Sequence, residues 1–185
     1  MKNVILTALI LVVGFANAQT KKIDVTKSSI EWIGKKVTGA HDGTIQLASG
    51  TLVMEKSELK GGKFVVDMTT INVKDLAAGK GKEKLEGHLK ADDFFGVDKF
   101  ATSALEFKKI AKKSTNVYTV TADLTIKGIT NPITFDITVD KNKATASLMV
   151  DRTKYDIKYG SGSFFDNLGD KAINDEFELK VNLAF

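Results

Sequence analysis

An alternation of apolar and polar residues in the second half of the chain limits its fold more than any other feature. Every second residue is apolar along four runs, at residues 118–126, 133–139, 144–150 and 177–185. Because successive side chains of a strand face opposite sides of the sheet, each run predicts a strand with one apolar and one hydrated face. Such strands belong to antiparallel sheets that enclose one shared interior, whereas buried parallel strands are apolar throughout.

Four further strands are expected in the first half, at residues 29–37, 44–54, 63–71 and 104–110. Gly61-Gly62 predicts a two-residue hairpin turn, while Lys127-Gly128 and residues 140–142 predict turns later in the chain. Eight to ten strands in sequential hairpins predict an all-β fold. The two candidates are a closed, up-and-down antiparallel barrel of about eight strands and a sandwich.

A helical segment interrupts the strands between residues 74 and 100. Leu85, His88 and Leu89 have the i, i+3, i+4 spacing of one helix face, which predicts a short helix over residues 82–90. A helix inserted between two hairpins of a barrel is expected to lie across one of its ends. The chain shows no internal repeat, low-complexity tract or linker, so residues 19–185 are expected to form one domain.

Residues 1–18 have the pattern of a secretory signal peptide. Lys2 precedes an apolar run over residues 4–13, and Ala16 and Ala18 then provide an A-x-A cleavage site before Gln19. The run is shorter than the ~20 residues of a membrane-spanning helix, which favours a cleaved signal over a retained anchor. We therefore expect a periplasmic or secreted protein of residues 19–185, and the loss of Lys2 would lower its net charge from +4 to +3.

Composition argues against several function classes. The chain has no cysteine, which excludes a disulfide framework, a thiolate metal site and a cysteine nucleophile. Its 27 basic residues include a single arginine, Arg152, whereas nucleic-acid binders use several guanidinium groups for phosphates and guanines. We expect no nucleic-acid partner and no cofactor. The small net charge attracts an anionic membrane surface only weakly, so contact with a membrane would be transient.

The expected barrel has a size at which the interior is either filled or just able to hold one small ligand. Strands of about eight residues, with a rise of ~3.3 Å and a tilt near 40°, give a lumen roughly 20 Å tall. The residues therefore predict an apolar lumen with room for an elongated lipid. This prediction depends on a set of small and medium-sized inward residues: Ala104, Val120, Ala122, Val139, Ala144 and Ala146.

Five motifs, in order along the chain, resemble those of the YceI-like family. They are SIEWIGKKVTGAHDGTI (29–45), HLKADDFF (88–95), LTIKGIT (124–130), DRTKY (151–155) and DEFEL (175–179). The resemblance implies a lipocalin-like barrel, export, a polyisoprenoid or similar long-chain amphiphile bound in the lumen, and the capacity to form a homodimer. Gly87 and Asp156 depart from the family pattern where a ligand headgroup would be met, so the headgroup is the least transferable property.

Nine residues are expected to form the ligand site, of which Arg152 has two interpretations. Its planar guanidinium would hold a polar or anionic headgroup, or it would pair with Asp151 and Asp156 and fix the loop after residues 144–150. Phe94 and Phe95 would line the mouth of the lumen or anchor the insertion, with one residue in each role favoured. The nine residues are Trp32, His88, Phe94, Phe95, Leu124, Phe135, Leu148, Arg152 and Tyr155.

The leading functional hypothesis is an exported lipid-binding protein for transport or storage, which requires no catalytic group. A structural or stress-related barrel without a dedicated ligand is the main alternative. An outer-membrane barrel is disfavoured because one Trp and three Tyr are too few for aromatic girdles. A metal site, or a hydrolase or isomerase that uses His88 or Asp92, is disfavoured because His41 and His88 lack zinc-ligand spacing and no catalytic motif is present.

Overall fold

The computed structural model describes residues 18–185, so the predicted signal peptide, apart from Ala18, lies outside the described residues. The described chain forms nine strands, one α-helix, α1 (Lys82–Lys90), and two 3-10 helices, η1 (Arg152–Tyr155) and η2 (Gly169–Lys171). The strands are β1 (Gln19–Lys22), β2 (Ser29–Lys36), β3 (Gly39–Glu55), β4 (Glu58–Val73), β5 (Thr102–Lys112), β6 (Val117–Ile126), β7 (Ile129–Asp140), β8 (Lys143–Asp151) and β9 (Ile173–Ala184).

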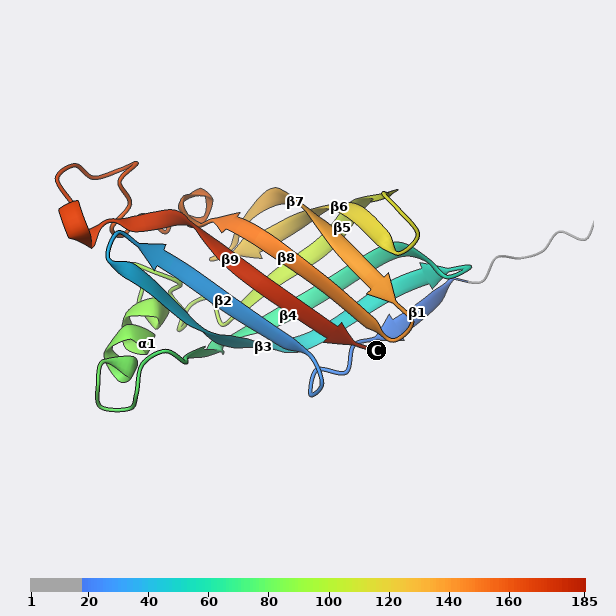
Figure 1. Ribbon diagram of the computed structural model, residues 1–185, viewed down its shortest axis with the longest axis horizontal. Helices are drawn as coiled ribbons and strands as arrows, with labels where there is room; N and C mark the ends of the chain where they lie inside the picture. Colours follow the sequence, from blue (N-terminus) through green and yellow to red (C-terminus); the bar gives the residue numbers. More distant parts are fainter. Residues whose placement is uncertain (1–17) are drawn as a thin grey trace, which may run out of the picture.

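Eight of these strands close a barrel (Figure 1). Strands β2 to β9 follow one another as antiparallel neighbours, and β9 returns to pair with β2. The ninth strand, β1, pairs with residues 51–54 of β3, beyond the stretch of β3 that β2 covers. The predicted up-and-down antiparallel barrel is therefore confirmed, and the sandwich alternative is wrong because the sheet closes on itself.

The elements expected from the sequence are all present. Each of the eight predicted strands overlaps one of β2 to β9, and the predicted helix coincides with α1. Strand β1 was not expected, because its four residues, QTKK, have no apolar alternation. It forms because residues 51–54 of β3 offer a free edge for pairing, and the local sequence of β1 does not reveal that edge.

The hairpin turn predicted at Gly61-Gly62 is wrong. The chain turns at Lys56-Ser57, where both residues have positive φ, at 50° and 66°. Gly61 and Gly62 instead lie inside β4, and a Cβ at Gly62 would come within 2.6 Å of the Phe107 ring. The glycine is required for space inside the barrel, since a side chain there would displace that ring. The turn at Lys127-Gly128 is confirmed, with φ of 52° and 73°.

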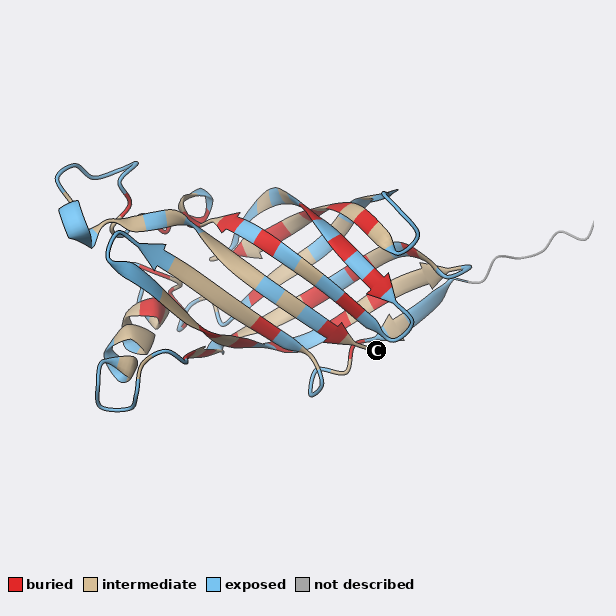
Figure 2. Ribbon diagram, in the orientation of Figure 1, coloured by how far each residue is buried: buried red, intermediate tan, exposed pale blue. Residues whose placement is uncertain are grey.

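The apolar faces of the strands point into the barrel and form its core (Figure 2). Burial along β6 alternates without interruption between buried and half-exposed residues, as its sequence pattern requires. Three aromatic rings pack within this core, with centroids 5.6 Å apart between Phe64 and Phe107 and 6.0 Å apart between Phe107 and Phe135. We call Phe64, Phe107 and Phe135 the aromatic plug, because they occupy the interior that an open lumen would need.

Helix α1 lies at one end of the barrel (Figure 1). Its Glu86 carboxylate accepts a hydrogen bond of 2.8 Å from the backbone N–H of Val73, and Lys82 Nζ donates one of 3.0 Å to Asn72 Oδ1. Both bonds tie the helix to the last residues of β4. Leu89 is the buried residue of the helix, and it faces the barrel interior. Within residues 18–185, no helix is long and apolar enough to span a membrane.

The shortest hydrogen-bonded ladder of the barrel is the one between β7 and β8. These strands pair over only four residues of each, whereas β6 and β7 pair over ten. Beyond the short ladder, η1 packs against β7, and the Asn131 side chain donates a hydrogen bond of 2.9 Å to the backbone carbonyl of Lys154. The segment that contains Arg152 therefore takes over part of the wall at the end where α1 lies.

Candidate functional site

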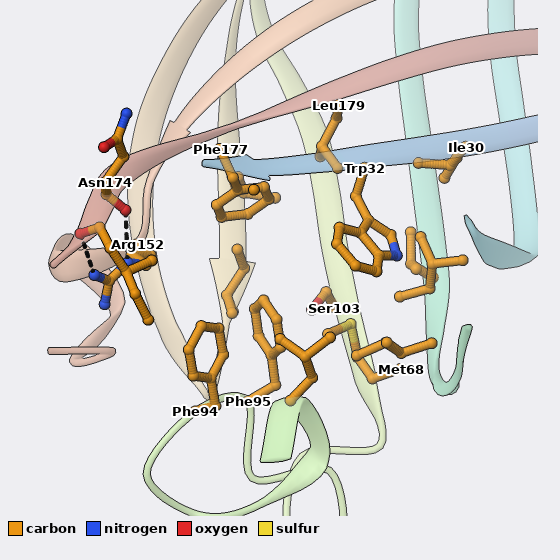
Figure 3. Close-up of a pocket in the computed structure, with 18 residues that line it drawn as sticks. Ile30, Trp32, Met68, Phe94, Phe95, Ser103, Arg152, Asn174, Phe177 and Leu179 are labelled. Atoms are coloured by element: carbon orange, nitrogen blue, oxygen red, sulfur yellow. Dashed lines mark hydrogen bonds between the residues drawn. The ribbon is translucent and has the colours of Figure 1, made fainter. Parts of the chain in front are cut away.

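A cavity of about 150 Å³ lies inside the barrel at the end that carries α1 (Figure 3). Strands β2, β3, β4, β5, β6 and β9 supply most of its wall, and Leu89, Phe94 and Phe95 close it from the side of α1. The lining is apolar except for Ser103, Arg152, Asn174 and the indole nitrogen of Trp32. Asn174 is exposed, so this part of the wall, at the start of β9, lies close to the protein surface.

Aromatic side chains from two parts of the chain meet in the cavity wall. The ring centroids of Phe94 and Phe95 are 5.3 Å apart, and those of Phe95 and Phe177 are 6.2 Å apart in an edge-to-face arrangement. Figure 3 shows Phe94 and Phe95 rising from the segment after α1 towards Phe177 of β9. Both phenylalanines line the cavity, so neither serves only as an anchor.

Trp32 forms another part of the wall and is the only tryptophan of the chain. It pairs with Gly43 of β3 on one side and with Leu179 of β9 on the other. A Cβ at Gly43 would lie 2.5 Å from Trp32 Cζ2, so the absence of a side chain there gives the indole its place. Its Nε1 is buried and has no hydrogen-bond partner among the described residues.

Arg152 is 2% exposed, and its guanidinium is held by the chain itself. Nε donates to the carbonyl of Asn174 at 3.0 Å, Nη1 to that of Ile157 at 2.8 Å, and Nη2 to that of Ile173 at 3.0 Å. The nearest acidic group is Asp175, with 3.6 Å between Nη2 and Oδ1. The side chain thus ties the η1 segment to the first residues of β9, which lie beyond the end of the β8–β9 ladder.

The expected pairing of Arg152 with its acidic sequence neighbours is wrong. Asp151 caps η1 by accepting hydrogen bonds from the backbone N–H and the hydroxyl of Thr153, at 3.0 and 2.6 Å. Asp156 pairs with Lys158 at 2.8 Å. Backbone carbonyls occupy the guanidinium in their place, because the loop folds back over Arg152 and presents carbonyls that would otherwise be unpaired.

Burial and local charge shift the pKa values of three groups where η1 meets the start of β9. Burial lowers the pKa of Arg152, and the carboxylates of Asp175 and Asp151 act in the opposite sense. For Asp175, burial would raise the pKa, but hydrogen bonds from Ser161 and Ser163 and the charge of Arg152 lower it overall. Burial, with the charge of Asp151 adding to it, raises the pKa of Tyr155 to about 12.

The structure brings five of the nine predicted site residues to the cavity wall: Trp32, Phe94, Phe95, Leu124 and Arg152. The other four lie elsewhere. Phe135 belongs to the aromatic plug, and Leu148 and Tyr155 are buried in the core away from the cavity lining. His88 packs behind the wall, with its ring centroid 5.6 Å from that of Phe94 and 4.5 Å from that of Tyr159.

The cavity does not extend along the residues that were expected to surround the lumen. None of the six residues expected to face inward lines the cavity. Ala104 follows the inward-facing Ser103 and faces outward, and Val120, Ala122 and Ala144 are packed to 1% exposure or less. The aromatic plug fills the volume that these small side chains leave free. Small residues on one strand therefore made room for large ones on another, which sequence patterns along single strands cannot reveal.

The two histidines lie in separate places. His41 Nδ1 is 2.7 Å from Asp75 Oδ2 at the junction of β3 with the segment after β4, whereas His88 is in the aromatic cluster behind the cavity. Within residues 18–185, no group of three or more His, Cys, Asp or Glu residues has a geometry that could hold a metal ion.

Several wall residues escaped the sequence analysis. Phe177 and Leu179 belong to a strand that the alternation predicted. Their inward direction therefore followed from the sequence, but their position along the barrel axis did not. Met68 lies in another predicted strand with the same ambiguity. Ser103 gave no signal at all, because an isolated serine at the start of a strand is usually exposed. In the structure it is 7% exposed and lines the cavity.

Comparison with known proteins adds to this geometry. The profile of the YceI-like domain matches residues 22–185. A UPF0312 protein from Staphylococcus aureus is 33% identical over 135 residues, which cover 67% of this chain and 71% of that protein. A second UPF0312 protein from the same species is 35% identical over 102 residues, covering 55% of this chain and 52% of its own length.

Solved structures share the barrel. BcnA from Burkholderia cenocepacia superposes with a TM-score of 0.71 at 20% identity, over 88% of this chain and 99% of BcnA. A polyisoprenoid binding domain from Saccharophagus degradans, implicated in plant cell wall breakdown, gives 0.61 at 15% identity, over 88% and 95%. At these identities the likeness concerns the fold alone. The domain profile, in contrast, covers nearly the whole described chain, and the protein therefore belongs to the YceI-like family.

Proposed function

We propose that the protein binds a long-chain lipid, such as a polyisoprenoid, through its apolar cavity. The observation that carries the proposal is an apolar cavity of about 150 Å³ inside a closed barrel, with Trp32, Phe94, Phe95 and Phe177 in its wall. The similarity to the polyisoprenoid binding domain of Saccharophagus degradans supports the same ligand class. Binding of this kind needs no reacting group, so we propose a carrier and not an enzyme.

The cavity volume limits how much of a lipid it can hold. A dry apolar cavity of about 150 Å³ accommodates a molecule of the size of benzene, and the cavity in this barrel has about that volume. Each buried CH₂ group contributes ~0.8 kcal/mol, so one five-carbon isoprene unit contributes about 3–4 kcal/mol before association costs. We therefore propose that one or two units of a chain enter the barrel, while the remainder stays outside the cavity.

Export and a role in transport or storage form the finer part of the proposal. Strand β1 begins at Gln19, the residue that follows the predicted cleavage site, so the folded domain would be complete after removal of residues 1–18. N-terminal sequencing of the protein recovered from its host tests this part. A sequence that starts at Gln19 in the periplasmic or secreted fraction is expected, and an intact N-terminus in the cytoplasmic fraction would contradict export.

Trp32 provides a direct test of lipid binding. Because the only tryptophan lines the cavity, a ligand that enters must change its fluorescence emission. Titration with isoprenoid alcohols of 5, 10, 15 and 20 carbons should show affinity that rises with length and reaches a plateau once the cavity is filled. The affinity should be nearly independent of salt, since apolar burial supplies it.

Native mass spectrometry of protein purified from its host provides the complementary measurement. A discrete additional mass, identified after organic extraction as a long-chain lipid, is the expected result. An empty barrel, together with no response of Trp32 to any isoprenoid alcohol, would refute lipid binding and favour a structural or stress-related role.

A further inference from the structure

Ser103 is a buried polar side chain in the cavity wall that the protein itself does not use. Its hydroxyl has no hydrogen-bond partner within the described part of the chain, and the residue is 7% exposed. Ser103 pairs with Val66 across β5 and β4, and Figure 3 shows it between Trp32 and Met68, facing Phe95. A hydroxyl that loses its hydration without gaining a partner is unfavourable, and such groups are rare in folded proteins.

The other polar groups of the cavity wall have hydrogen-bond partners in the protein or are exposed to solvent. Three donors of Arg152 bind the carbonyls of Ile157, Ile173 and Asn174. Asn174 itself is exposed, so water can satisfy its side chain. Only the Ser103 hydroxyl and the Trp32 Nε1 remain as buried, unpartnered polar atoms among the described residues of the cavity wall.

A trapped water would satisfy these atoms poorly. Buried waters typically make about three hydrogen bonds, and cavities with mostly apolar walls stay dry. Around Ser103 the wall is formed by Val66, Met68 and Phe95, which offer no side-chain partner to a water. An oxygen that belongs to an apolar ligand fits better, because the rest of the ligand covers these side chains.

We propose that Ser103 selects ligands by a hydrogen bond to an uncharged oxygen, a hydroxyl or a carbonyl, that lies inside the cavity. The inference rests on the proposed lipid binding and narrows it from any long chain to an oxygen-bearing amphiphile. A charged group is disfavoured at this position, since a buried anion needs a compensating charge and Arg152 is already occupied by carbonyls and Asp175. Of the two roles considered for Arg152, a headgroup ligand and a structural pairing, this proposal moves the first to Ser103.

The experiment compares matched ligands and matched variants. Farnesol and farnesene have the same isoprenoid skeleton, and only farnesol carries a hydroxyl. Their dissociation constants are measured by Trp32 fluorescence for the purified wild-type protein, Ser103→Ala and Ser103→Thr. The alanine variant should bind farnesol about five- to tenfold more weakly, the usual effect of one lost neutral hydrogen bond. Its affinity for farnesene should stay within about twofold of wild type, and Ser103→Thr should retain much of the preference for farnesol.

Thermal unfolding of the ligand-free variants separates recognition from structure. Because the Ser103 hydroxyl has no partner, Ser103→Ala should unfold at the same temperature as wild type or at a higher one. A clearly lower midpoint would show that the hydroxyl stabilises the fold, and it would overturn the proposal.

The remaining outcomes are also decisive. If Ser103→Ala weakens the binding of farnesol and of farnesene equally, Ser103 affects the shape of the cavity and does not recognise a ligand oxygen. If farnesyl phosphate binds wild type more tightly than farnesol, the preference for an uncharged group is wrong. If both neutral probes bind wild type and the alanine variant alike, the inference fails while lipid binding stands. If neither probe binds wild type, the proposed function fails together with the inference.

Discussion

Gly50 and Phe64 face each other across β3 and β4, and a Cβ on Gly50 would lie 2.8 Å from Cδ1 of the Phe64 ring. The glycine therefore permits the position of the first ring of the aromatic plug. Phe64 is 6% exposed and lies two residues from Val66, which lines the cavity, on the same face of β4. Phe64 therefore lies next to the cavity without being part of its wall.

Replacing Gly50 with alanine should destabilise the protein by about 1–3 kcal/mol, the usual cost of overpacking a core. The added methyl group would meet both Phe64 and Ile23, the latter at 2.9 Å, so neither can move without disturbing the core. Urea denaturation measures the free energy of unfolding. The matched control is Gly34→Ala, where a Cβ meets nothing within 4 Å, and equal losses in the two variants would contradict the packing argument.

Phe64→Ala should extend the cavity towards the far end of the barrel. We expect a stability loss of about 3–5 kcal/mol, because a large buried ring is removed and its space is only partly refilled. The plateau in affinity for isoprenoid alcohols should then move to longer chains. Phe64→Leu, which keeps most of the volume, is the control. An unchanged plateau in the alanine variant would show that the plug does not limit ligand length.

Arg152→Lys should destabilise the fold although the charge is retained. A lysine ammonium cannot reproduce the planar fork that reaches three carbonyls, and the Asp175 carboxylate would lose its neighbour. The expected loss is about 3–5 kcal/mol, the range for breaking a buried charged network. The ratio of affinities for farnesol and farnesyl phosphate should change little. A large change in that ratio with stability intact would restore Arg152 as the headgroup ligand.

Tyr155 should make stability depend on pH in the alkaline range. Its pKa is about 12 in the folded protein and about 10 in an unfolded chain. Because the folded pKa is the higher one, the contribution is fully present below pH 10 and is lost as the pH rises towards 12, by about 2–3 kcal/mol at most. Tyr155→Phe cannot ionise, so its free energy of unfolding should fall less over this interval. Parallel curves for the two proteins would exclude the effect.

Phe94 and Phe164 form a matched pair for testing the cavity. Phe94 is 7% exposed in the wall, whereas Phe164 is 50% exposed and does not line the cavity. Phe94→Ala should cost about 3–5 kcal/mol of stability and should weaken the binding of isoprenoid alcohols. Phe164→Ala should change stability by no more than about 0.5 kcal/mol and leave binding unaltered. Equal effects on binding would place the ligand outside the cavity.

Much of the fold could be predicted from the sequence, because the relevant information is local. Period-two alternation identifies a strand and its inward face without knowledge of its neighbours, and the spacing of Leu85, His88 and Leu89 identifies α1 in the same way. Eight sequential strands then leave few ways to bury all the apolar faces. The prediction failed at Gly61-Gly62, where a glycine required for packing against Phe107 has the same appearance in the sequence as a glycine required by a turn.

The candidate site was predicted only in part. Trp32, Phe94 and Phe95 were found because large aromatics in family-like motifs stand out in a sequence. The position of a residue along the barrel axis depends on strand register and on the bulges in β3, so Phe135 and Leu148 could not be separated from residues that reach the cavity.

The amino-acid sequence by itself determined β2 to β9, the helix and most of the inward faces, since each follows from the periodicity of neighbouring residues, and it limited the architecture to a barrel or a sandwich. The tertiary structure decided the rest: the plug that shortens the lumen, the carbonyls that occupy Arg152, and the unpartnered hydroxyl of Ser103. These three features depend on contacts between residues far apart in the chain, and close packing allows only one arrangement of such contacts at a time.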